Sequence, residues 1–111
     1  MDKIEIPILN NQYKVIVCWG DNKYVRRVLK HYGYNEDKDV FGDAEALTFN
    51  ERLLHPVIAL RRFPETPEDI GTLAHEAVHA VKYIFDHIEE QSSDEIFAHS
   101  VGAIVREALE G

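Results

Sequence analysis

The chain has 111 residues, of which 45% are hydrophobic and 29% are charged, and its formal net charge is −8 at pH 7. A chain of this length can form a single domain over residues 1–111, and its apolar content argues against intrinsic disorder. The acidic balance argues against nucleic acid as a partner, and no apolar run is long enough to span a membrane. Met1–Glu5 lacks the features of a signal peptide and Cys18 is the only cysteine, so we expect a cytoplasmic protein without disulfides.

Two strands are predicted at the N-terminus. Residues 3–9 alternate between apolar and polar side chains, and Pro7 within them favours a strand at the edge of a sheet. A short polar turn separates them from residues 13–19, which also alternate, so the two segments predict a β-hairpin. Cys18 lies within the second strand, and this setting favours an inert, half-buried thiol over a nucleophile.

The next predicted element is a helix from about residue 22 to residue 32. Asp21 is its candidate N-cap, and Gly33 is the residue expected to end it. The polar, turn-rich residues 34–43 predict a loop. Two further strands are predicted at residues 45–49 and 57–62.

Two helices are predicted in the C-terminal half. Thr66 is followed by Pro67 and two acidic residues, which is a strong helix start, and the apolar periodicity continues to about His87. A short link precedes a last helix from about Ser93 to Leu109. Together the elements predict an α+β domain in which a small, mostly antiparallel sheet packs against about three helices.

The first of these two helices carries the most informative motif of the chain, His75-Glu76-Ala77-Val78-His79. Side chains four residues apart share one face of a helix, so His75 and His79 can bind one metal ion. Imidazole nitrogens bind Zn²⁺ at ~2.0–2.1 Å, and an open coordination position holds a water whose pKa falls to ~7. Glu76 can accept the proton of that water. The motif also lies opposite the apolar face of the helix, so a solvated polar surface is the alternative interpretation.

A catalytic zinc site needs a third protein ligand, and Glu95 on the last predicted helix is a candidate. With Thr72-Leu73-Ala74 before the motif and Asp94-Glu95-Ile96-Phe97-Ala98-His99 after it, about the last 45 residues resemble small HExxH metallopeptidase-like proteins of tailed phages and prophages. The resemblance implies a minimal zincin fold with Glu95 as a zinc ligand. His99 departs from that family's pattern, which usually has Tyr there, and its role is left open. Ser92 and Glu95 also match a capping box, which needs no metal.

Three other residues have candidate roles near such a metal. His99 is a competing third ligand or a donor that stabilises the transition state, Asp94 could orient a ligand histidine, and Tyr83 could polarise a carbonyl. Ordinary surface or core roles explain these residues at least as well. Gly102 on the last helix is expected to allow close approach of a neighbouring helix.

These features predict zinc-dependent hydrolysis of a peptide or amide bond in a peptide or protein substrate, with Zn²⁺ as cofactor and no nucleic-acid or membrane partner. The resemblance implies that the strand before the motif helix, residues 57–62, borders the cleft and pairs with an extended peptide. It also implies the host cytoplasm as location if the chain is phage-encoded. Two alternatives stay open. One is a non-catalytic, phage-type binding or inhibitory protein with a structural or vestigial zinc site. The other is a metal-dependent hydrolase of non-peptide bonds such as RNA phosphodiesters, which the acidic charge disfavours.

Overall fold

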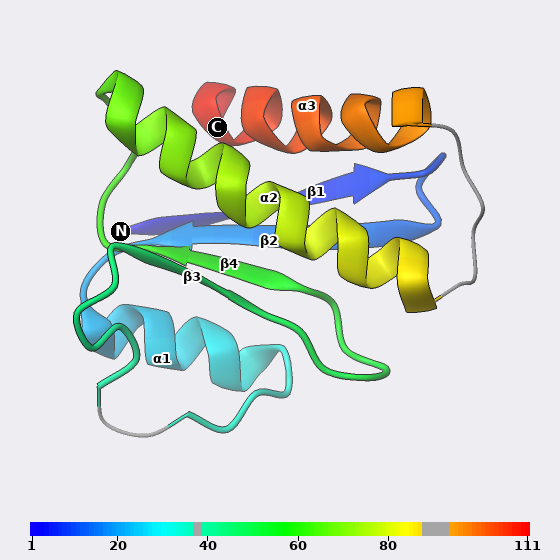
Figure 1. Cartoon of the computed structure of the whole chain (residues 1–111). Helices are drawn as coiled ribbons and strands as arrows, with labels where there is room; N and C mark the ends of the chain where they lie inside the picture. Colours follow the sequence, from blue (N-terminus) through cyan, green and yellow to red (C-terminus); the bar gives the residue numbers. More distant parts are fainter. Residues whose placement is uncertain (37–38, 88–93) are drawn as a thin grey trace.

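The computed structural model describes residues 1–36, 39–87 and 94–111 and shows a four-stranded sheet with three helices (Figure 1). This confirms the predicted α+β class. No helix within these three ranges combines the length and the apolar character needed to cross a membrane. In chain order the elements are β1 (Asp2–Ile8), β2 (Tyr13–Trp19), α1 (Asn22–His31), β3 (Ala46–Phe49), β4 (Val57–Leu60), α2 (Pro67–His87) and α3 (Asp94–Glu110).

The sheet consists of two antiparallel pairs joined by one parallel pair. Its strand order is β1-β2-β4-β3, with β1 antiparallel to β2, β3 antiparallel to β4, and β2 parallel to β4. The predicted N-terminal hairpin is therefore confirmed. Strand β1 lies at one edge of the sheet, where Pro7 is tolerated because an edge strand has neighbours on one side alone.

The prediction that residues 57–62 pair with an extended peptide is wrong for β4. Strand β4 lies inside the sheet with β2 on one side and β3 on the other, and all four of its residues are buried. Its continuous apolar sequence is typical of a strand covered on both faces, and no free edge remains for a peptide. The edge position next to β4 belongs to β3 instead.

Helices cover both faces of the sheet. Helix α1 lies on one face, and α2 and α3 lie side by side on the other (Figure 1). Because side chains alternate along a strand, Val15 and Val17 of β2 enter the core beneath α2 and α3, whereas Ile16 and Cys18 enter the core beneath α1. Helix α2 packs on β3 and β4, while α3 packs on α2 and β1.

Helix α2 begins and ends where the sequence predicts. The Asp69 N–H donates to Thr66 Oγ1 (3.1 Å), and the Thr66 N–H donates to Asp69 Oδ2 (3.3 Å). This reciprocal pair is a capping box that satisfies donors which the first helical turn leaves unpaired. The proposed capping box at the start of α3 involves Ser92, which lies outside the described residues.

The loop after α1 is tied to the sheet, which its polar sequence did not predict. Residues 34–36 and 39–43 contain no helix or strand, as expected, but Tyr34, Val40 and Phe41 are buried against the α1 face of the sheet. The Tyr34 hydroxyl lies 3.0 Å from the Phe49 carbonyl oxygen and 2.7 Å from that of His55. These contacts hold both ends of the β3–β4 connection.

Candidate metal and catalytic site on helix α2

Two histidines lie one turn apart on the exposed face of α2. The Nε2 atoms of His75 and His79 are 3.1 Å apart, and the rings meet edge to face at 84°. Two ligand atoms at ~2.0–2.1 Å from a tetrahedral zinc ion lie about 3.3–3.4 Å from each other. The pair therefore fits two neighbouring coordination positions with a shift of a few tenths of an ångström. Without metal, the same distance allows one ring N–H to donate to the other ring.

The glutamate between the histidines points toward the edge strand of the sheet. Glu76 Oε1 accepts a hydrogen bond from Thr48 Oγ1 at 2.7 Å, and the same hydroxyl lies 3.1 Å from the Glu76 carbonyl oxygen. Thr48 belongs to β3, and its side chain lies on the face that α2 covers. The carboxylate is thus held between α2 and the free edge of the sheet, beside the histidine pair but not part of it.

Thr48 is a site residue that the sequence did not reveal. It lies within a short predicted strand with no motif around it, and it meets Glu76 because β3 is the strand beneath α2. Nothing local in the sequence specifies that β3 rather than β4 takes the edge. The sequence does show a hydroxyl side chain, Thr48, in an otherwise apolar strand. It would have indicated a site residue only if β3 were also known to lie at the sheet edge, and that position is known only from the sheet topology.

Glu95 lies in the first turn of α3, whereas the histidines lie in the middle of α2. Phe97 of α3 packs edge to face on Phe85 of α2, with ring centroids 5.5 Å apart, so the start of α3 lies beside the end of α2. His79 precedes Phe85 by roughly 9 Å along the helix axis, at 1.5 Å per residue. Glu95 is exposed in the first turn of α3. Its role as third zinc ligand stays a prediction.

Among the described residues, three other predicted ones form no hydrogen bond or ring contact with the histidine pair, and their roles stay predictions. Asp94 and His99 are exposed in the first two turns of α3. Tyr83 stacks on His87 with the rings 5.6 Å apart and 13° from parallel, so it faces the last turn of α2. Within residues 1–36, 39–87 and 94–111, no three His, Cys, Asp or Glu side chains converge in a group that could hold a metal ion.

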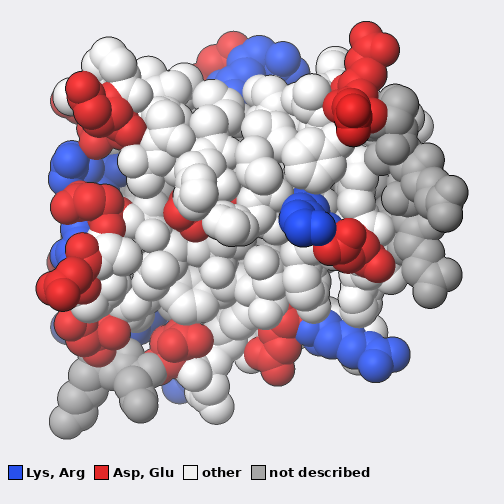
Figure 2. Space-filling view, in the orientation of Figure 1, with Lys and Arg blue, Asp and Glu red and all other residues white. Residues whose placement is uncertain are grey.

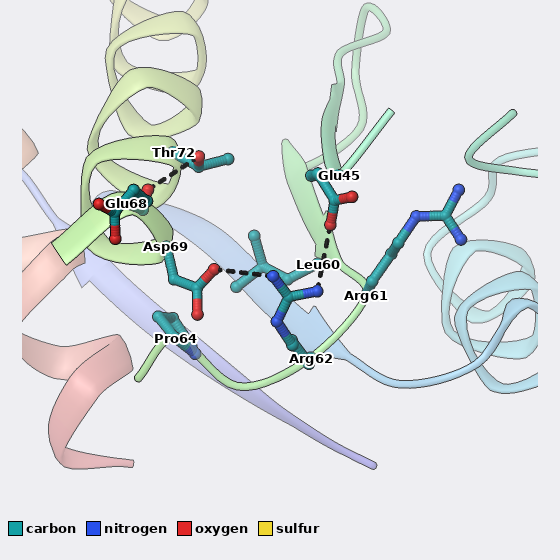
Figure 3. Close-up of a pocket in the computed structure, with 8 residues that line it drawn as sticks. All are labelled: Glu45, Leu60, Arg61, Arg62, Pro64, Glu68, Asp69 and Thr72. Carbon is teal, nitrogen blue, oxygen red and sulfur yellow. Dashed lines mark hydrogen bonds and ion pairs between the residues drawn. The ribbon is translucent and has the colours of Figure 1, made fainter. Parts of the chain in front are cut away.

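A polar cavity of about 290 Å³ lies at the start of α2, one helical turn before the motif (Figure 3). Arg62 crosses it and binds Glu45 (3.2 Å) on one side and Asp69 (3.1 Å) on the other. Hydrogen bonds from the backbone N–H groups of Glu65 and Thr66 lower the pKa of Asp69. These charged groups are paired with one another. The ion pairs of Arg62 therefore join the strand side of the cavity to the start of α2 and need no ligand to explain them.

The face formed by α2 and α3 is largely uncharged at its centre, with acidic and basic side chains mainly around its margin (Figure 2). A shallow apolar groove between the two helices is lined by small residues that include Ala74, Ala98 and Gly102. A Cβ atom built on Gly102 would meet nothing within 4 Å, whereas close packing by a neighbouring helix was expected. That expectation is wrong, because the groove leaves Gly102 in open space.

No family model matches the chain, and no curated protein or solved structure matches it either. These results overturn the expected membership in the phage and prophage HExxH metallopeptidases with a minimal zincin fold. The described residues also lack the assembled three-ligand group that such a membership implied. The physical reason for the error is that the resemblance rested on local helical patterns, which amphipathic helices of unrelated proteins can share. What remains is the geometry of His75, Glu76 and His79 themselves.

Proposed function

We propose that the protein hydrolyses peptide or amide bonds with a zinc ion held by His75 and His79 and with Glu76 as general base. The observation that carries this proposal is the 3.1 Å spacing of the two Nε2 atoms beside a carboxylate turned toward a free strand edge. The lone cysteine is buried, and we propose the reducing cytoplasm as the location.

Each residue has a separable task in this proposal. When bound, zinc supplies a water of lowered pKa and polarises the carbonyl oxygen of the substrate. The Glu76 carboxylate accepts the proton of the attacking water and passes it to the leaving amine. The Thr48 hydroxyl fixes one carboxylate oxygen and leaves the other available for that proton. Glu95 is our proposed third ligand, with His99 as the competing donor.

The free edge of β3 provides a place for an extended peptide. The Arg61 N–H donates to the Glu45 carbonyl at 3.3 Å, which identifies these two residues as a hydrogen-bonded pair one residue beyond the β3–β4 ladder. Pairs alternate along an antiparallel ladder, so Ala46 and Thr48 direct their backbone N–H and C=O groups away from β4. A peptide that adds to this edge would pass beside Thr48 and hence beside Glu76.

The experiment measures metal and activity on the same variants. Protein purified without added metal is expected to contain one zinc per chain, and His75→Ala and His79→Ala are expected to lose it. Glu76→Gln is expected to keep the zinc while hydrolysis of a mixed peptide library falls by ~10²–10⁴-fold, the usual contribution of a general base. Stoichiometric zinc in both histidine variants would refute the site. Zinc with no turnover on any peptide would favour the non-catalytic binding or inhibitory protein instead.

The third ligand is tested by zinc titration of single variants on α3. Losing one of three protein donors should lower zinc affinity by orders of magnitude, whereas losing a helix-capping side chain should leave it nearly unchanged. Glu95→Ala is compared with His99→Ala and with Asp94→Ala, the other two candidate side chains in the first two turns of α3, and Ile96→Ala is the control from the same helix. Wild-type affinity in Glu95→Ala would exclude Glu95 as the ligand.

A further inference from the structure

A second cavity, the apolar pocket, lies at the far end of α2 from the polar cavity. Its volume is about 280 Å³, and the β3–β4 connection, the start of β2 and the last turn of α2 form its walls. Sites for small molecules usually measure ~300–1,000 Å³, so this pocket suits one side chain better than a whole ligand. Its apolar lining is provided mainly by Tyr13, Leu53, Leu54, Pro56, Tyr83 and Ile84.

Leu53 at the rim of the pocket contributes little to the stability of the fold. Its side chain is 90% exposed, and its backbone adopts a φ of 70°, in the left-handed region. The Leu54 N–H closes the turn by donating to the Glu51 carbonyl at 3.0 Å, which places Leu53 where glycine or asparagine is preferred. Leu53 thus places an exposed apolar side chain at the pocket rim on a strained backbone. This combination favours a contact between Leu53 and another molecule.

The apolar pocket lies in line with Glu76 along the same side of α2. Tyr83 follows Glu76 by seven residues, which brings it within about 20° of the same direction and roughly 10 Å further along the helix. Strand β3 runs the same way, from Thr48 through Phe49 into the connection that carries Leu53. An extended peptide advances ~3.3 Å per residue, so a side chain about three residues from the bond at Glu76 lies level with the pocket along the direction of α2.

We propose that the apolar pocket receives an aromatic or branched aliphatic side chain of the peptide substrate, about three residues from the bond that is cleaved. The cleavage position rests on the proposed function, but the side-chain recognition does not require a metal. The described residues that line the pocket include no Asp or Glu, so a basic side chain would find no partner there. Lys14 at the rim already lies 3.6 Å from Glu5.

The test is a nuclear magnetic resonance titration of metal-free protein with three capped amino acids: N-acetyl-phenylalaninamide, N-acetyl-leucinamide and N-acetyl-lysinamide. The first two are expected to shift the amide signals of Tyr13, Leu54 and Ile84, and the lysine derivative is not. Leu53→Asn, which suits a positive φ, should lower the affinity about five-fold through lost apolar contact. Ile96→Asn, an exposed apolar position on α3, is the matched control and should bind like wild type.

The outcomes separate this proposal from the proposed function. Equal shifts with the lysine derivative, no shifts at the pocket, or unchanged affinity in Leu53→Asn would each overturn it. Apolar binding without any peptide hydrolysis would leave the pocket standing and remove the catalytic proposal. Hydrolysis with no apolar preference at any substrate position, in a peptide library with one varied position, would overturn the pocket and leave the catalytic proposal standing.

Discussion

The hydrogen bond from Thr48 to Glu76 should stabilise the protein measurably, because it joins the edge strand to α2 through a charged acceptor. Thr48→Val keeps the shape of the side chain and removes its hydroxyl. Hydrogen bonds to charged groups contribute about 1.5–3 kcal/mol when buried. Both side chains are half-buried, so water can replace part of the lost bond, and we expect a loss of about 0.5–1.5 kcal/mol in the free energy of unfolding.

A double-mutant cycle isolates this bond from other effects of the substitution. Urea unfolding is measured for wild type, Thr48→Val, Glu76→Met and the double variant, and the coupling energy should account for most of the Thr48→Val loss. Thr48→Ser keeps the hydroxyl and should keep most of the coupling with Glu76. Additivity within about 0.3 kcal/mol would show that the two side chains do not interact in solution, and it would remove Thr48 from the candidate site.

Two further predictions concern stability alone. Gly102→Ala should raise the free energy of unfolding by about 0.5–1 kcal/mol, because alanine favours the helix and its Cβ would meet nothing within 4 Å. Thermal unfolding measures this change. A lower melting temperature in the variant would mean that the groove at Gly102 is occupied in solution. Burial raises the pKa of the Cys18 thiol to about 12, whereas the unfolded chain loses this proton near pH 9. Between these values the unfolded state binds fewer protons, so this contribution to stability is complete below about pH 9 and is lost as the pH rises toward 12, by up to about 4 kcal/mol. Urea unfolding from pH 8 to 11 should show this decline, and Cys18→Ala should flatten it; an equal decline in the variant would assign it to other groups.

The local elements could be predicted because their determinants lie close together in the chain. The Thr66–Pro67 start of α2, the Asp21 cap of α1 and the alternation in β1 and β2 each depend on neighbouring residues. The spacing of His75 and His79 belongs to the same class, since four residues on any helix bring two side chains to one face. These parts of the fold and of the site follow from helix and strand geometry alone.

The arrangement of those elements depends on contacts between distant residues, which local patterns do not encode. Strand β4 pairs with β2 as a parallel neighbour, and this long-range pairing moves β3 to the edge and brings Thr48 to Glu76. The position of Glu95 likewise depends on how α3 packs along α2, where Phe97 meets Phe85. Such pairings are decided by which apolar faces bury each other most completely, a property of the whole chain, so only the tertiary structure shows them.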